Sequence, residues 1–303
     1  MGSKPGKQGF SVEVPATASV ADLKSAIALK KKHLYPSRQR LSLVSESSKR
    51  LTDETKLTDI SNGLLKDGLE FKLKDLGPQI SWTTVFLVEY AGPLLIHPLF
   101  FYCPKLWYGK NFEHSALQKY VFAFVMLHFL KRELETLFVH RFSHATMPWF
   151  NIVKNSGHYH ILSGVLLAFD IYRPKYSATS PYILNTIRND EQFLWICTGI
   201  WLYAELSNLH THLKVRSLRP PGSTKRAIPY GYGFNLVSLP NYFFEIIAWT
   251  TISVMTNSAA AWLFTIVATG QMALWAIKKH KNYKKEFGKE YPRARKAMIP
   301  FLL

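Results

Sequence analysis

The spacing of apolar residues changes near residue 78 and divides the chain into a polar part and an apolar part. In residues 1–77, the runs FSVEV, QRLSLVSE and LEFKLKDL alternate apolar and polar positions, which predicts half-buried strands. Four apolar residues recur at roughly helical spacing between the first two runs: Val20, Leu23, Ile27 and Leu29. Because Ser19 directly precedes them, we expect a helix with Ser19 as its N-cap.

The order of these predicted elements indicates a small N-terminal α+β domain that ends at residue 77. A strand, a helix, a strand, short turns and a last strand follow one another, and the strand after the helix is rich in leucine. This order resembles the ubiquitin-like fold. We therefore expect residues 1–77 to form a ubiquitin-like cytosolic domain.

Long apolar runs follow residue 78. We interpret six of them as membrane spans, near residues 80–102, 118–139, 155–172, 191–209, 236–256 and 258–278. A helix of about 20 apolar residues crosses a bilayer, and most of these runs are that long. The predicted fold class is therefore mainly α: residues 78–303 form a polytopic membrane domain of about six transmembrane helices.

The distribution of basic residues predicts the orientation of these spans. With six spans, the loop 210–235 and the tail 279–303 lie on the same side as the N-terminus, and both are rich in Lys and Arg. The opposite loops, 104–116 and the one near residue 257, carry few. Since loops rich in Lys and Arg stay in the cytosol, we expect both termini to be cytosolic.

Composition narrows the possible partners. The 38 Lys and Arg exceed the 20 Asp and Glu and give a net charge of +18, which suits a membrane surface or anionic ligands. No zinc-finger, RNP or basic-zipper pattern occurs, so we expect no nucleic acid partner. The N-terminus lacks the apolar core of a signal peptide, and two cysteines do not form a disulfide framework.

Polar residues recur inside the apolar runs. Glu89 lies within the first run. The others are three or four positions apart and so share helix faces: His128 with Arg132, Lys131 with Glu135, Asn208 with His212, and Tyr242 with Glu245. Charges inside a membrane are costly unless they are paired or face a cavity. This repetition predicts one polar cavity between the helices.

Each of these residues also has a structural interpretation. Lys131, Arg132 and Arg141 lie near a predicted helix end, from which their side chains can reach the lipid headgroups. Glu89 and Glu245 can form buried pairs with basic residues, and Tyr242 can be an interfacial aromatic residue.

One histidine pattern invites a metal hypothesis. His140 and His144 have HxxxH spacing, and HTH supplies His210 and His212. Membrane di-iron enzymes also use adjacent His-His pairs, which this chain lacks. We predict no metal.

Three motifs carry a family resemblance. The segments LPNYFFE, LRPPGSTKRAIP and KNYKKEFGKEYPRARKAMIPFLL resemble the C-terminal domain of the steroid 5α-reductase family. Within that family, KDLGPQISWTTVFLVEYAGPL and KRELETLFVHRFSHATMP are similar to the very-long-chain trans-2-enoyl-CoA reductase branch, which also has a ubiquitin-like N-terminal domain. The resemblance covers nearly the whole chain. It implies an endoplasmic reticulum membrane enzyme that uses NADPH to reduce an enoyl-CoA in the last step of each fatty-acid elongation cycle.

The resemblance also implies roles for individual residues. The tyrosine of PNY is Tyr242 and the lysine of KRELET is Lys131, and both look like the catalytic residues of the branch, together with Glu89. The cofactor pocket that the resemblance implies contains ten residues: Arg132, His140, Arg141, His144, Asn208, His212, Arg219, Asn241, Glu245 and Tyr283.

These roles agree with the chemistry of reducing an enoyl thioester. Hydride addition at the β-carbon develops negative charge on the thioester oxygen, so a positioned donor such as the Tyr242 hydroxyl is needed. A Lys131 cation nearby would stabilise a phenolate. The basic loops suit NADPH and acyl-CoA, which are polyanionic. No G-x-G-x-x-G motif follows a strand, which excludes a Rossmann fold.

Other functions use the same architecture. Alternatives are a reductase of another enone such as a steroid, a membrane methyltransferase of the isoprenylcysteine type that uses S-adenosylmethionine, and a scaffold without activity. As partners we expect the acyl-CoA substrate, membrane lipids and other enzymes of the elongation cycle.

Overall fold

The computed structural model describes residues 9–44, 51–60, 69–142, 145–220 and 226–303. The chain divides into two compact units, residues 1–82 with 144–149 and residues 83–143 with 150–303. His144, one of the predicted cofactor residues, lies outside the described residues.

The first unit contains a short helix and a two-stranded antiparallel sheet. Helix α1 (Val20–Lys30) begins with the expected cap, because the Ser19 hydroxyl accepts from the Asp22 N–H at 3.2 Å and the Asp22 carboxylate accepts from the Ser19 N–H at 2.8 Å. Strands β1 (Gln39–Leu43) and β2 (Phe71–Asp75) confirm two of the three predicted strands.

The prediction of a strand at FSVEV is wrong, because residues 10–14 form no strand. Alternation alone does not supply a partner for the backbone hydrogen bonds of a strand. The segment still packs on the core of the first unit through Val12 and Val14, which explains its apolar alternation. That core is formed by eight buried residues: Ala18, Val20, Leu23, Ile27, Leu34, Leu41, Leu51 and Leu57.

Short elements complete the first unit. The 3-10 turn η1 (Pro36–Arg38) leads into β1, and α2 (Leu57–Ile60) adds one helical turn. Strand β3 (Gln79–Ser81) pairs antiparallel with β4 (Thr146–Pro148). The described part of this unit is therefore α+β, while the ubiquitin-like fold and the domain limits 1–77 and 78–303 stay predictions.

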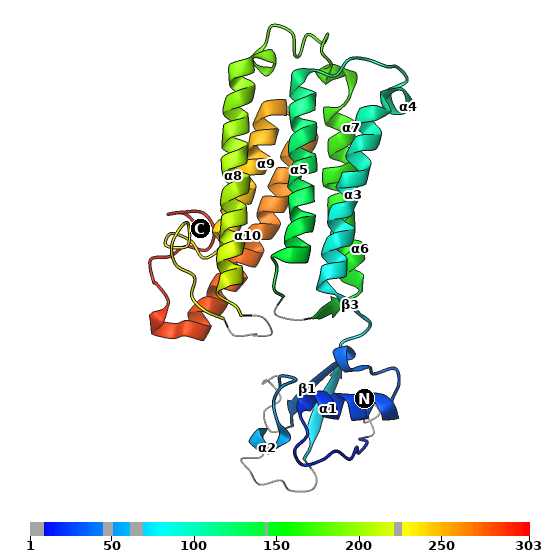
Figure 1. Ribbon diagram of the computed structural model, residues 1–303, viewed down its shortest axis with the longest axis vertical. Helices are drawn as coiled ribbons and strands as arrows, with labels where there is room; N and C mark the ends of the chain where they lie inside the picture. Colours follow the sequence, from blue (N-terminus) through cyan, green and yellow to red (C-terminus); the bar gives the residue numbers. More distant parts are fainter. Residues whose placement is uncertain (1–8, 45–50, 61–68, 143–144, 221–225) are drawn as a thin grey trace, which may run out of the picture. The chain divides into compact units, whose positions relative to one another are not determined.

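The second unit is a bundle of long helices (Figure 1). The helices of the bundle are α3 (Trp82–Tyr102), α5 (Ala116–Phe138), α8 (Glu191–Ser217), α9 (Pro240–Thr256) and α10 (Ala259–Phe287). Three consecutive pieces form a further helical segment of the bundle: α6 (Phe150–Ser156), the π-helix η2 (Gly157–Leu166) and α7 (Leu167–Ile171). The shorter pieces are α4 (Pro104–Tyr108), η3 (Pro174–Tyr176), η4 (Ile187–Asn189) and η5 (Gly288–Glu290). Each of the six predicted apolar segments thus contains helix, and the fold is mainly α.

Two helices among the described residues are long and apolar enough to cross a membrane: Trp82–Tyr102 and Ala259–Glu290, the latter joining α10 to η5. The expected count of six spans therefore remains a prediction. Helices such as α5 combine apolar residues with charged ones, as the run Lys131–Glu135 shows, and this lowers their mean hydropathy.

Large apolar side chains nevertheless face outward along α5. Four leucines spaced by three and four residues are about half exposed: Leu127 (53%), Leu130 (47%), Leu134 (48%) and Leu137 (53%). Such a stripe is costly in water and favourable in lipid. With the two apolar helices, it indicates that the chain associates with a membrane.

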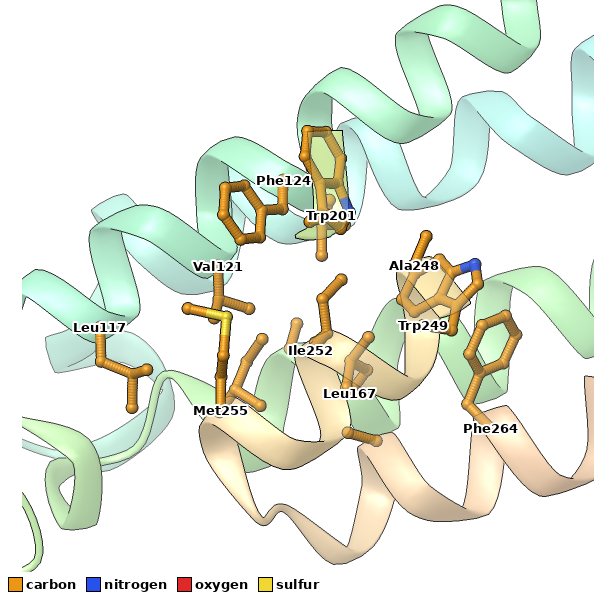
Figure 2. Close-up of a cluster of buried hydrophobic side chains, with 14 of the residues drawn as sticks. Leu117, Val121, Phe124, Leu167, Trp201, Ala248, Trp249, Ile252, Met255 and Phe264 are labelled. Atoms are coloured by element: carbon orange, nitrogen blue, oxygen red, sulfur yellow. The ribbon is translucent and has the colours of Figure 1, made fainter. Parts of the chain in front are cut away.

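The apolar core of the bundle lies between α5, α7, α8, α9 and α10 (Figure 2). Phe124 of α5 stacks on Trp201 of α8 with ring centroids 4.4 Å apart, and Trp249 of α9 meets Phe264 of α10 edge-on at 4.5 Å. Aromatic pairs of this kind contribute about 0.5–1.5 kcal/mol beyond area burial. The first pair joins α5 to α8 and the second joins α9 to α10, next to the polar cluster described below.

Helix α3 approaches the π-helix closely at two glycines. A Cβ atom at Gly92 would lie 2.0 Å from the His160 ring, and one at Gly164 would lie 2.8 Å from Ile96. The His160 Nε2 lies 2.9 Å from the Val88 carbonyl oxygen. This contact fixes the part of α3 that carries Glu89.

Candidate active site

Charged side chains from α5, α8 and α9 meet inside the bundle. His128 of α5 lies between two carboxylates, with Nδ1 2.7 Å from Glu205 Oε1 and Nε2 3.3 Å from Glu245 Oε1. His128 and Glu205 are buried. Since an imidazole donates from both nitrogens only when it is protonated, this geometry suits a cationic His128.

Lys131 lies one turn further along α5 and binds three oxygens. Its ammonium donates to Asn208 Oδ1 at 2.6 Å and lies 3.0 Å from Glu205 Oε2 and 3.3 Å from Glu135 Oε1. The structure thus brings together two predicted site residues, Lys131 and Asn208. Together with His128, Lys131 neutralises the carboxylates around it.

Asn208 links α8 to α9. Its Nδ2 donates to the Asn241 carbonyl oxygen at 2.9 Å and to Glu245 Oε2 at 3.0 Å. Three residues predicted to bind the cofactor therefore lie in contact with one another. Asn241 takes part through its backbone.

Arg132 extends the cluster toward α3. Its Nη1 donates to Glu135 Oε2 at 2.5 Å, and its Nη2 donates to the Tyr90 hydroxyl at 2.9 Å. His212 Nδ1 lies 3.1 Å from Glu135 Oε1. Two further predicted cofactor residues, Arg132 and His212, thus share the buried carboxylate of Glu135.

Glu135, His140 and His212 could together hold a metal ion, because one donor atom from each lies within 4.8 Å of the others. A divalent cation there would face Arg132 and Lys131, which already neutralise Glu135. Burial, assisted by Arg132, lowers the pKa of His140 to about 3. His140 is therefore neutral at pH 7, and its buried Nδ1 has no hydrogen-bond partner among the described residues.

Glu89 of α3 is buried but only partly satisfied. Its carboxyl group bonds the Asn155 side chain of α6, while its Oε2 has no hydrogen-bond partner in the described parts of the chain. Its neighbour Tyr90 connects α3 to Arg132. Since an unsatisfied buried polar atom costs about 1–3 kcal/mol, a hydrogen bond from a ligand to this oxygen would be favourable.

Among the described residues no hydrogen bond joins Tyr242 to Lys131, the lysine that we expected beside its hydroxyl. The Tyr242 hydroxyl accepts from Lys279 Nζ of α10 at 3.2 Å. The Tyr242 ring packs on a cluster that includes Met272 and Ala276 of α10. The Lys131 ammonium binds Asn208 and two carboxylates instead.

Arginine side chains gather beyond the helix ends. Arg219 Nη1 donates to the Arg141 carbonyl oxygen at 2.7 Å, and Arg141 donates in return to the Arg219 carbonyl oxygen. Burial and the neighbouring Arg226 and Arg141 lower the pKa of Arg219. Two guanidinium groups without a carboxylate partner among the described residues form a site suited to anions.

Tyr283, the last predicted cofactor residue, lies in an aromatic stack at the end of α10. Its ring is parallel to that of Tyr291 at 5.5 Å and to that of Phe287 at 6.0 Å. Among its charged neighbours are Arg219 and Lys279.

Comparison with known proteins identifies the family. The family model of 3-oxo-5-alpha-steroid 4-dehydrogenase matches residues 145–303. The chain is 39% identical to the very-long-chain enoyl-CoA reductase of Dictyostelium discoideum over 300 residues, 98% of this chain and 96% of that one. The chain belongs to the 3-oxo-5-alpha-steroid 4-dehydrogenase family. It is also 39% identical to the probable very-long-chain enoyl-CoA reductase art-1 of Caenorhabditis elegans, covering 96% and 93% of the two chains. It is 31% identical to the trans-2,3-enoyl-CoA reductase-like protein of Mus musculus, covering 96% and 79%.

The residues matched by the family model, 145–303, include only some of the candidate site residues. Asn208, Tyr242 and Glu245 lie within the matched residues, whereas Glu89 and Lys131 precede them. The match to the Dictyostelium discoideum protein spans nearly the whole chain.

Sequence reasoning missed Glu205, a member of the cluster, and Lys279, the partner of Tyr242. Glu205 precedes Asn208 by three residues on one face of α8, so its spacing could have revealed it. Lys279 lies in a run of basic residues that suggests a solvated surface, and nothing in that run distinguishes it. Its partner comes from a different helix, which only the fold brings near.

Proposed function

We propose that this chain reduces very-long-chain trans-2-enoyl-CoA to the saturated acyl-CoA with NADPH, as the last step of the fatty-acid elongation cycle. The observation that carries the proposal is the 39% identity to a very-long-chain enoyl-CoA reductase over 98% of the chain. The buried polar cluster supports it, because reduction of a conjugated thioester needs donors placed in a water-poor site.

The proposal includes a place in the cell. We place residues 78–303 in the endoplasmic reticulum membrane as six spans with both termini cytosolic, and residues 1–77 as a cytosolic ubiquitin-like domain. Membrane lipids and the other enzymes of elongation are the proposed partners. The outward leucine stripe of α5 and the basic tail support this arrangement.

The residues of the candidate site fit the cofactor NADPH. Arg141 and Arg219 offer guanidinium groups to the phosphates, and the Tyr283–Tyr291 stack offers an aromatic surface. The buried Nδ1 of His140 has no hydrogen-bond partner among the described residues and is a further polar atom for the cofactor. When bound, NADPH supplies the hydride. The proposed cofactor set is completed by Arg132, His144, Asn208, His212, Asn241 and Glu245.

The proposed catalytic groups act on the charge that the reaction creates. Tyr242 donates a hydrogen bond to the thioester oxygen, where negative charge develops. Lys131 contributes a positive charge, and Asn208 and Glu205 hold its ammonium in place. Glu89 offers its unpartnered oxygen to the substrate or to a proton.

A second candidate is the reduction of a steroid enone, which the description of the matching family favours. Both reactions reduce a double bond conjugated to a carbonyl, so the same donors would serve. The two candidates differ in whether the substrate carries the phosphates of coenzyme A. The arginines of the loops favour the thioester of coenzyme A.

The purified protein in detergent tests the proposal through oxidation of NADPH. We expect turnover with a very-long-chain trans-2-enoyl-CoA and none with an enone steroid. Tyr242→Phe should lower turnover by about 10²–10⁴-fold, the usual contribution of a general acid. NADPH should raise the melting temperature, and S-adenosylmethionine should not. The opposite pattern of stabilisation would favour a methyltransferase instead.

A further inference from the structure

The contact between Tyr242 and Lys279 joins the first turn of α9 to the last third of α10. Lys279 Nζ lies 3.2 Å from the Tyr242 hydroxyl and 5.3 Å from the centre of its ring. An ammonium group donates hydrogen bonds and cannot accept them. The Tyr242 oxygen is therefore the acceptor, and its own O–H hydrogen is left for another acceptor.

That hydrogen has no acceptor among the described residues, since the bond from Lys279 is the one hydrogen bond formed by the Tyr242 hydroxyl there. Tyr242 is half-buried, with its ring packed on the cluster of Met272 and Ala276. A phenol fixed by packing and by one donor presents its remaining hydrogen in a defined direction. Such a group is ready to bind a carbonyl oxygen.

Lys131 is not available for this role. Its ammonium has three oxygen neighbours, from Asn208, Glu205 and Glu135. Lys279, by contrast, forms no ion pair with a carboxylate in the parts of the chain that the structure describes. Its charge therefore acts on Tyr242 without being neutralised.

We propose that Lys279 is a positioning residue that acts through Tyr242, holding the phenol in place and stabilising negative charge on its oxygen as it bonds the substrate. This inference rests on the proposed function. It leaves Lys131 in the proposed catalytic set, but not as the partner of the Tyr242 hydroxyl. Lys279 is exposed, so solvent screens its charge.

The neighbouring Lys278 provides a matched control, since it belongs to the same helix and, one position away, points in a different direction. We expect Lys279→Ala to lower kcat about tenfold to hundredfold, less than an oxyanion donor in a buried site contributes. KM for the enoyl-CoA should change less than threefold. Lys279→Arg should recover most of the loss, and Lys278→Ala should stay within about twofold of the unmodified protein.

A double variant tests whether the two residues act together. Lys279→Ala should add little to Tyr242→Phe if Lys279 acts through the hydroxyl, because residues that act as a unit are not additive. Multiplied losses would overturn the inference. Equal losses in Lys278→Ala and Lys279→Ala, or a loss confined to KM, would also overturn it.

A spectroscopic measurement separates this inference from the proposed function. With 3-fluorotyrosine at position 242, the fluorine resonance at fixed pH should move in Lys279→Ala and stay in place in Lys278→Ala. If the resonance moves but the unmodified protein reduces no enoyl-CoA, the contact stands and the proposed function fails. If the protein is active and Lys279→Ala changes neither resonance nor kcat, the inference alone fails.

Discussion

Three carboxylates and three basic side chains meet between α5 and the helices α8 and α9. The acids are Glu135, Glu205 and Glu245, and the bases are His128, Lys131 and Arg132. The charges balance when His128 is protonated, which the placement of both its ring nitrogens beside carboxylate oxygens favours. Removing one member of a buried pair leaves an uncompensated charge.

Replacing His128 should therefore destabilise the protein strongly. We expect His128→Leu to cost about 3–5 kcal/mol of stability, since Glu205 and Glu245 would lose their shared partner. His210→Leu is the control, because His210 is exposed and its loss should stay within about 0.5 kcal/mol. Denaturation of the detergent-solubilised variants measures the difference. Similar stabilities of the two variants would contradict a charged bridge at His128.

Replacing Arg219 should weaken the binding of NADPH more than the binding of NADH. Arg219→Ala should weaken NADPH binding about tenfold more than NADH binding if the guanidinium bonds the 2′-phosphate, because charge-assisted bonds contribute about 1.5–3 kcal/mol. Arg216→Ala serves as the control, since Arg216 is exposed near the end of α8. Dissociation constants by calorimetry measure the effect. Equal weakening of both cofactors would exclude the 2′-phosphate contact.

Helix α3 and the π-helix η2 meet so closely that one residue at their contact has to be glycine. A methyl group at Gly92 would lie 2.0 Å from the His160 Cδ2 atom, far inside van der Waals contact. The His160 side chain also bonds the Val88 carbonyl of α3. Displacing this ring would shift the part of α3 that carries Glu89.

Gly92→Ala should lower stability although alanine favours helices. Overpacking typically costs about 1–3 kcal/mol, which exceeds the roughly 1 kcal/mol that alanine gains over glycine in a helix. Gly199 of α8 is the matched control, because its Cβ would meet nothing within 4 Å. Gly199→Ala should therefore be neutral or stabilising. Thermal unfolding of both variants measures this, and parallel shifts would refute the close contact.

The elements show what a sequence of this kind can predict. Apolar runs located α3, α5, α8, α9 and α10, because a helix in an apolar environment needs a continuous apolar surface. The π-helix was not predictable from the apolar run that contains it, and the close approach of its His160 ring to Gly92 of α3 is visible only in the fold. The missing strand at residues 10–14 shows that alternation also arises where a segment simply packs on a core.

Of the candidate site, the sequence could predict only which residues share a face of one helix. Asn208 and His212 lie four residues apart and do meet the same cluster, as their spacing indicated. Glu135 is a partner of Lys131 on the same helix, as its spacing indicated, but Asn208 and Glu205 come from another helix, as does the partner of Tyr242. Sequence periodicity carries no information on how different helices face each other. The pair of Tyr242 and Lys279 could therefore be found only in the fold.

At the scale of the whole molecule, the polar cluster belongs to one unit. Every described residue of the proposed site lies in residues 83–143 or 150–303. The first unit has its own core of buried residues from Ala18 to Leu57 and its own sheet. No residue of the described part of the proposed site comes from residues 1–77.

Deletion of residues 1–77 should leave turnover per folded molecule within about threefold of that of the full chain. The deletion removes α1, β1 and β2 but keeps β3 and its partner β4, which pair through Ile80 and Met147. It also removes the Tyr35 hydroxyl that accepts from the Gln79 N–H, so some loss of stability is expected. The measurement is NADPH oxidation with a very-long-chain enoyl-CoA, normalised to protein that elutes as a folded species. A lower yield alone agrees with a stabilising role for residues 1–77. Loss of turnover in a folded, correctly inserted truncation would show that the first unit contributes to the reaction itself.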